Sequence, residues 1–264
     1  MKNNIIRVLA VALFCAFMVQ DVAAQRFIGS VVAGANFAQI EGDNVHGFTK
    51  VGFNGGLGLT LPLNRKQTWQ LSVELLYSMK GSVKKYSQAG NFDTTVWAPS
   101  MYQDVDYSVP FDPKTKCNIS LDYVQVPVLI HYEDNYSGCT FGLGFAWGRL
   151  VRAHEVYYGF TRTTTVRSGT YKKNDWSVIA DFNVRLYKNL SLNFRWEYSI
   201  VPIRIQQFES RRTGETYTSK YHNHVISTRL IYYINEKFYE NKRVNKYGQR
   251  MGVKWLREIP EYNN

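Results

Sequence analysis

Apolar and polar residues alternate along several stretches of this chain. In residues 190–200 every even position is apolar or aromatic and every odd position is polar. Residues 176–186 repeat this pattern with Ile179 as the exception, and residues 69–79 show the same alternation, with the apolar residues at odd positions and Leu76 as the exception. Because successive side chains of a β-strand point to opposite faces, alternation over ten residues predicts strands with one apolar face.

Five further stretches fit the same frame with weaker alternation, namely residues 27–40, 51–63, 119–132, 139–148 and 221–234. In residues 119–132 the apolar face changes parity near Tyr123 and Val124. Either a β-bulge at this point or a partly apolar interior at that level would explain the change. The pattern therefore predicts eight strands.

The predicted connections alternate in length. Three are hairpin-sized (64–67, 133–138 and 187–189), and four are long (41–50, 82–118, 153–173 and 206–220). Bacterial outer-membrane barrels have short periplasmic turns and long extracellular loops, and tilted strands of about ten residues cross the bilayer. The sequence thus predicts an all-β fold over residues 25–235: an eight-stranded antiparallel up-and-down transmembrane β-barrel with short periplasmic turns and long extracellular loops.

A soluble lipocalin-like barrel that carries an apolar ligand is the first alternative, because alternation alone does not say which face is outside. Two features favour lipid outside. The polar face combines opposite charges with glycines, which suits a narrow filled lumen. The apolar face is rich in aromatic residues near strand ends, as in the girdles of membrane barrels; these are Trp69, Tyr77, Trp147, Trp176, Trp196, Tyr198 and Tyr232.

Both ends of the chain differ from the predicted barrel. Residues 1–24 combine a basic start, a short apolar core and small residues before Gln25, which predicts a secretory signal peptide cleaved after Ala24. Residues 236–264 form a basic tail with seven lysines or arginines against four glutamates. An even number of strands returns the chain to the periplasmic side on which it began, so this tail is predicted to be periplasmic. The whole chain has 264 residues, a net charge of +11 and 45% hydrophobic residues, so it is not of the disordered class.

Charged residues on the polar faces would lie inside the barrel. Three acids and three arginines share those faces: Glu74, Asp181, Glu197, Arg185, Arg195 and Arg229. Unpaired buried charge is costly, so these groups should pair with one another. We expect a lumen closed by a charge network; a gate or an ion path is the functional alternative.

The long loops supply the candidate binding surfaces. Six basic residues form a predicted extracellular rim that suits lipopolysaccharide phosphates or anionic glycans, namely Arg162, Arg167, Lys172, Lys173, Arg211 and Arg212. Loop 82–118 is long and aromatic, and we expect it to fold over the barrel mouth or to contact an envelope protein. The tail 236–264 is a second candidate for such a partner. Membrane lipid is the expected environment, and nucleic acid is not an expected partner.

The chain offers no defined catalytic or metal-binding motif. His222 and His224 share one face of a predicted strand but have no third ligand at a clear spacing. No Ser–His–acid set is defined by spacing either, although His154 stands at a loop entry. We therefore predict no catalytic, cofactor-binding or metal-binding residue and a non-enzymatic role. An outer-membrane enzyme with an active site at the rim is the second alternative.

Two cysteines remain after the predicted cleavage. Cys117 would lie at the outer end of one strand and Cys139 at the periplasmic end of the next. The bilayer core between these ends is about 30 Å thick, whereas a disulfide needs Cα atoms within about 7 Å. We expect no bond between them.

Several short motifs resemble the PorT-like outer-membrane β-barrel family of the Bacteroidetes. They are Gly34-Ala35-Asn36, Gly52-Phe53 with Gly55-Gly56, Glu74-Leu75-Leu76-Tyr77 with Lys80-Gly81, and Leu121-Asp122-Tyr123-Val124-Gln125-Val126-Pro127. The resemblance covers about residues 26–235 and implies an eight-stranded outer-membrane barrel without a shared activity. Families of this kind usually carry Glu at the position of Gln125. One branch belongs to the type IX secretion machinery, and nothing in the sequence places the chain in it.

Overall fold

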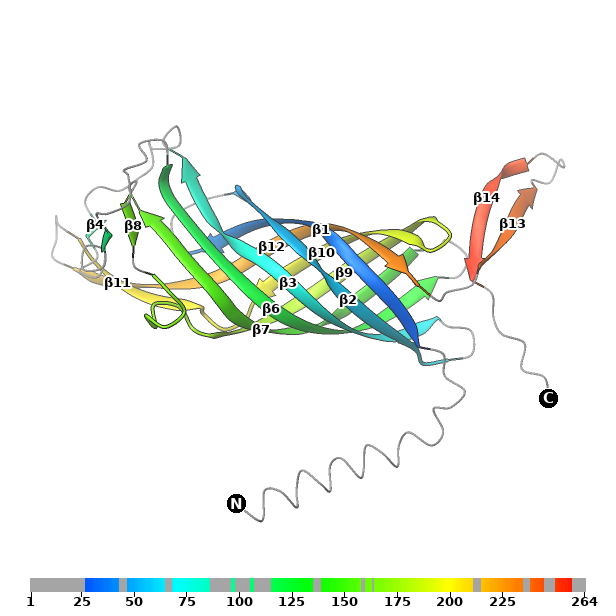
Figure 1. Ribbon diagram of the computed structural model, residues 1–264, viewed down its shortest axis with the longest axis horizontal. Coiled ribbons are helices and arrows are strands. Elements are labelled where there is room, and N and C mark those ends of the chain that lie inside the picture. The colour runs from blue at the N-terminus through cyan, green and yellow to red at the C-terminus, as the bar shows by residue number, and fades with distance from the viewer. Residues whose placement is uncertain are drawn as a thin grey trace, which may run out of the picture.

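Eight long antiparallel strands close into a barrel in the computed structural model (Figure 1). The structure describes residues 27–42, 47–64, 68–85, 96–97, 105–106, 115–134, 139–157, 160–162, 164–210, 215–234, 238–244 and 250–257. The barrel strands are β1 (Ile28–Glu41), β2 (Lys50–Pro62), β3 (Trp69–Lys85), β6 (Thr115–Asp134), β7 (Cys139–Tyr157), β9 (Asn174–Tyr187), β10 (Leu190–Ser199) and β12 (Thr216–Tyr233). Each pairs with the next, and β12 pairs with β1. The predicted up-and-down barrel is confirmed.

The apolar face of the strands points outward. Leu143 is 70% exposed and Phe145 is 63% exposed, whereas the polar residues that alternate with such positions are buried. Six of the seven predicted girdle aromatics are exposed, and Tyr198 is half-buried. A soluble carrier would need the opposite arrangement, so this surface fits a barrel surrounded by lipid. In the described part of the chain, no helix is long and apolar enough to cross a membrane.

The parity change in β6 has its cause inside the barrel. The odd-numbered residues of β6 face the lumen on both sides of this point, as the buried side chains of Ile119, Tyr123 and Leu129 show. The alternation of β6 therefore contains no bulge. The interior is apolar near Ile119 and Tyr123, as the second explanation required. A bulge does occur beside this point, but in β7: the register against β6 shifts between Asp122 and Tyr123, and Val151 is the extra residue.

Three of the predicted loops contain strands, which the prediction missed. Four short strands extend the extracellular end: β4 (Val96–Trp97), β5 (Val105–Asp106), β8 (Phe160–Arg162) and β11 (Arg204–Ser210). β11 pairs with β12 and with β4 (Figure 1). β8 pairs with β7 and with β5. Neither β8 nor β11 neighbours β3, from which loop 82–118 departs. Within this loop, β4 and β5 therefore pair with strands that do not neighbour β3.

The two cysteines lie at opposite ends of the β6–β7 hairpin. Cys117 pairs through its backbone with Tyr157 at the extracellular end, and Cys139 pairs with Asp134 beside the short turn. Cys139 is a free thiol. Asp134 follows Cys117 by 17 residue steps along β6, about 55 Å of strand, so no disulfide can join the two cysteines.

The C-terminal segment contains a separate two-stranded sheet. β13 (Phe238–Val244) and β14 (Arg250–Arg257) pair in antiparallel fashion, which the sequence pattern did not predict. β12 ends at the same end of the barrel at which β1 begins, because Ser30 pairs with Tyr233. The C-terminal segment thus follows the end of the barrel that carries the short turns, and its periplasmic location stays a prediction.

A protease added to intact cells should spare the C-terminal segment. The membrane would shield Lys242 and Arg243, whereas trypsin should reach the segment after the outer membrane is permeabilised. The measurement is immunoblotting of a C-terminal epitope before and after permeabilisation. Loss of the epitope from intact cells would mean that the strand count or the orientation is wrong.

Candidate functional site

The inward positions of the middle strands carry a buried ion-pair network. Register places Arg195 of β10 directly beside Asp181 of β9. Arg195 donates from Nε to Asp181 Oδ1 at 2.7 Å and from Nη2 to Oδ2 at 2.8 Å, a bidentate pair. Its Nη1 lies 2.9 Å from Glu74 Oε2 of β3. One guanidinium thus links three strands across the lumen.

Arg229 of β12 completes this network, which is called the lower network because it lies nearer the periplasmic end than the network described next. Its Nη1 lies 3.0 Å from Glu74 Oε2, its Nη2 lies 3.5 Å from Asp181 Oδ2, and Nε donates to Asn193 Oδ1 at 2.8 Å. Gly34 of β1 pairs with Arg229, and a Cβ at Gly34 would collide with the backbone of Thr228 and Arg229. Glycine at position 34 therefore allows β1 to pack closely against the strand that carries Arg229.

A second network lies nearer the extracellular end. Lys80 of β3 is fully buried, and its Nζ lies 2.6 Å from Glu197 Oε1 and 3.0 Å from Asp175 Oδ2. Gln125 donates to Glu197 Oε1 at 2.8 Å, and Asn223 donates to Asp175 Oδ2 at 2.9 Å. The amide of Gln125 is therefore a hydrogen-bond donor to a carboxylate that Lys80 already neutralises.

An apolar layer closes the lumen above the second network. Ile40, Ile119, Leu121 and Tyr123 of the wall pack with Tyr171 and Ile203, which come from the segments between the long strands. The remaining members of the cluster are Leu150, Ala153 and Tyr221.

Arg204 of β11 contacts the same region of the mouth. Its guanidinium lies 5.3 Å from the ring centre of Tyr171 and 5.6 Å from that of Tyr221. It also lies 3.4 Å from Glu155 Oε2. Above the second network, the described side chains that fill the lumen are thus this apolar layer and the ion pair between Arg204 and Glu155.

The structure brings together four of the six predicted lumen residues in one network: Glu74, Asp181, Arg195 and Arg229. Glu197 belongs to the second network instead. Arg185 lies near the periplasmic turn, where Nη1 donates to the carbonyl oxygen of Lys188 at 3.0 Å. Sequence reasoning missed Lys80 and Asp175, each one residue beyond a stretch of clear alternation.

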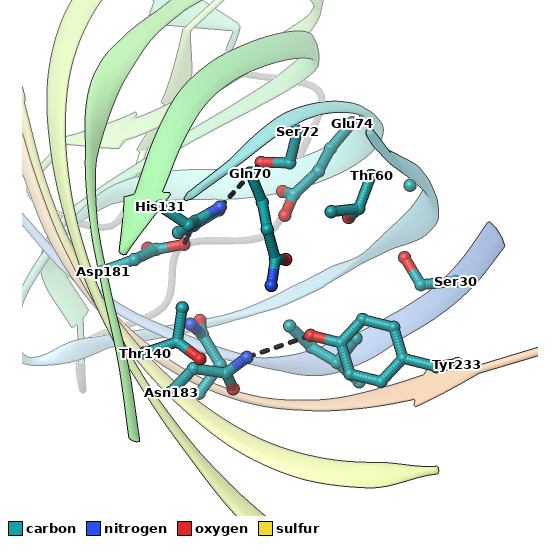
Figure 2. A pocket seen from close by; sticks show the side chains of 13 residues that line it. Ser30, Thr60, Gln70, Ser72, Glu74, His131, Thr140, Asp181, Asn183 and Tyr233 are labelled. Atoms are coloured by element: carbon teal, nitrogen blue, oxygen red, sulfur yellow. Dashed lines mark hydrogen bonds and ion pairs between the residues drawn. The ribbon is translucent and has the colours of Figure 1, made fainter. Parts of the chain in front are cut away.

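A small polar cavity lies beside the lower network, toward the periplasmic end (Figure 2). Its volume of about 20 Å³ is enough for the centre of one water molecule. Ser72 Oγ lies 3.2 Å from His131 Nδ1, and His131 Nε2 lies 3.5 Å from Asp181 Oδ2. This serine–histidine–aspartate order is that of hydrolase triads. Asp181 is bound by Arg195, however, and the cavity has no room for an acyl substrate.

The predicted basic rim is only partly described. Arg167, Lys172 and Lys173 are exposed at the extracellular end. Arg162 lies in β8, but its side chain is outside the described part, and Arg211 and Arg212 lie outside the described residues altogether.

His222 and His224 lie on the outer surface of β12. Trp196 Nε1 donates to His224 Nε2 at 2.7 Å, and His222 Nδ1 lies 2.9 Å from the carbonyl oxygen of Ser199. The ring of His222 stacks on Tyr198 at 5.8 Å between centroids. Within the described residues, no group of three metal-ligating side chains converges. The two imidazoles thus belong to an aromatic cluster on the outer wall.

A closed antiparallel barrel with an apolar belt and a polar, filled interior defines the class of bacterial outer-membrane β-barrel proteins. The model of the family described as outer membrane protein beta-barrel domain matches residues 20–204, and the chain belongs to this family. The protein is therefore assigned to the bacterial outer membrane. The narrower resemblance to PorT-like proteins stays a prediction.

A comparison with solved structures finds several outer-membrane barrels. Ail of Yersinia pestis, in complex with the heparin analogue sucrose octasulfate, is 10% identical, with a TM-score of 0.41 over 79% of this chain and 99% of that chain. Neisserial surface protein A is 11% identical, with a TM-score of 0.37 over 78% and 95%. The outer membrane protease OmpT of Escherichia coli is 10% identical, with a TM-score of 0.29 over 80% and 94%. No curated protein matches the sequence.

Proposed function

We propose that the protein is a closed, non-enzymatic barrel with a structural, binding or assembly role in the cell envelope. The observation that carries this proposal is the filled lumen: the ion pairs of Arg195, the ion pairs of Lys80 and the apolar layer around Tyr171 follow one another along the barrel. Eight strands enclose little more than their own side chains. A barrel filled in this way supports a role for its outer surface and rim rather than for a pore.

The proposed absence of enzymatic activity has its own support in the lumen. Ser72, His131 and Asp181 are the serine–histidine–acid set that the described residues bring together, but the neighbouring cavity holds about one water molecule. The bidentate contact with Arg195 also competes for the carboxylate that would orient the histidine. We interpret the set as part of the packing of the lumen.

Planar lipid bilayers test the closed state. Purified protein that migrates on a gel as a folded barrel should insert without giving steady channels, because buried side chains of the described residues fill the lumen in three successive layers. The heat-unfolded sample serves as the control for detergent leakage. Large and stable single-channel steps from the folded sample alone would overturn the proposal and favour a porin-like function.

The PorT-like motifs support a narrower form of the same proposal. Gly34 lies against Arg229, and Lys80 and Gln125 both contact Glu197, so three motif residues contribute to the lumen. Membership of the secretion-related branch is tested by the neighbouring genes. Genes for type IX secretion components beside this one would support it, and an unrelated neighbourhood would favour a separate envelope role.

A further inference from the structure

A basic patch lies on the outer wall of β7 and on the segment that leads into β9. Arg149, Arg152, Lys172 and Lys173 are exposed. The backbone joins the two segments, because the amide of Leu150 donates to the carbonyl oxygen of Lys173 at 2.8 Å. No exposed residue in 149–154 or 172–176 is acidic. Four positive charges are therefore concentrated on β7 and on the adjacent segment that leads into β9.

The β-bulge at Val151 shapes this patch. Regular alternation would turn Arg152 inward, but Val151 and Arg152 both face outward. Arg152 Nε lies 2.8 Å from Asp122 Oδ2, and its side chain remains 61% exposed. Arg149 donates from Nη1 to Asn174 Oδ1 at 2.8 Å. The two guanidiniums are thus held in place while parts of both remain open to a ligand.

The patch begins where the apolar belt ends. Trp147 pairs in register with Trp176, and both rings are exposed on the outer wall. Arg149 follows Trp147 by two residues on the same face, about 7 Å toward the extracellular end. Tryptophan marks the boundary between the bilayer core and its headgroups. The cations therefore lie at the level of the outer-leaflet headgroups.

We propose that Arg149, Arg152, Lys172 and Lys173 bind the phosphate groups of lipid A in the outer leaflet. Guanidinium and ammonium groups are the usual protein donors to phosphate. The position directly above Trp147 and Trp176 favours a lipid over a soluble polyanion, because the acyl chains of a bound lipid would cover the apolar wall below. The site lies on the outer surface, so it does not depend on whether the lumen conducts.

Binding of purified protein to lipid A in detergent micelles tests the site. The probes are bisphosphorylated lipid A and the same lipid A without its phosphates, with binding measured by titration calorimetry. The variant Lys172→Gln/Lys173→Gln should bind the phosphorylated lipid about 30-fold more weakly than the natural protein, since each cation near an anionic surface adds about a fivefold factor. Adding Arg149→Gln should weaken binding further.

The matched control is Lys188→Gln/Lys220→Gln, which also removes two exposed positive charges, one at the short turn between β9 and β10 and one on β12, which does not neighbour β7. This control should bind within about twofold of the natural protein. All variants should keep the gel mobility of a folded barrel. Equal affinity for the lipid without phosphates, or equal losses in the control and the Lys172→Gln/Lys173→Gln variant, would overturn the proposal. A sulfated oligosaccharide that depends on the same residues, while lipid A does not bind, would assign the patch to soluble glycans.

Discussion

Replacing Lys80 by methionine should lower the free energy of unfolding by about 3–5 kcal/mol, the usual cost of removing one partner of a buried ion pair. Lys80 is the cation that the described residues place against both Asp175 and Glu197. Methionine fills much of the same space but leaves two buried carboxylates without a positive charge. The measurement is urea unfolding of the barrel in phosphatidylcholine vesicles, supported by the temperature at which the folded band disappears from a gel.

Two further variants separate the charge effect from packing. Lys80→Met/Glu197→Gln removes one of the two buried carboxylates that have lost their positive partner, and it should recover part of the lost stability. Lys220→Met removes an exposed charge from β12 and should change stability by less than about 0.5 kcal/mol. If Lys80→Met were as harmless as Lys220→Met, the second network would not contribute to the closed barrel.

The barrel itself could be predicted from alternation because lipid and lumen impose opposite polarities on successive residues. Residues 190–200 show this most clearly, and the structure places β10 over 190–199. The same argument could not find β8 or β11, because outside the bilayer both faces of a strand meet water or protein. The alternation that marks a membrane strand is then lost.

The charged character of the lumen could be predicted, but the choice of partners could not. Arg195 and Asp181 are neighbours in register on adjacent strands. Lys80 of β3, in contrast, reaches Glu197 of β10 across the barrel. Contacts across the lumen depend on the tilt and stagger of all eight strands, which no local pattern contains.

The direction in which a single side chain of the outer basic patch points could not be predicted from the local sequence pattern either. Charge in the long loops alone predicts Lys172 and Lys173 as rim residues, but it does not predict Arg149 and Arg152. Arg152 faces outward only because Val151 is inserted before it against β6. A bulge shifts the parity of every residue that follows it in the strand, and its position is decided by pairing with the neighbouring strand.

Replacing Arg195 by alanine should destabilise the barrel by about 3 kcal/mol, the lower end of the range for a broken buried pair. Arg229 remains within 3.0 Å of Glu74 and 3.5 Å of Asp181, so both carboxylates keep one cation. Arg229→Ala should have an effect of similar size for the same reason. The measurement is again urea unfolding in vesicles, with Arg167→Ala as the control for an exposed arginine.

The double variant Arg195→Ala/Arg229→Ala tests whether the two arginines share the same carboxylates. Each single variant leaves the other guanidinium in contact with Glu74 and Asp181, whereas the double variant leaves those acids with His131 as the remaining basic contact that the described residues show. The loss in the double variant should therefore exceed the sum of the two single losses by at least about 1 kcal/mol. Additive losses would mean that Arg195 and Arg229 act independently, and that the lower part of the lumen is held by two separate pairs rather than by one network.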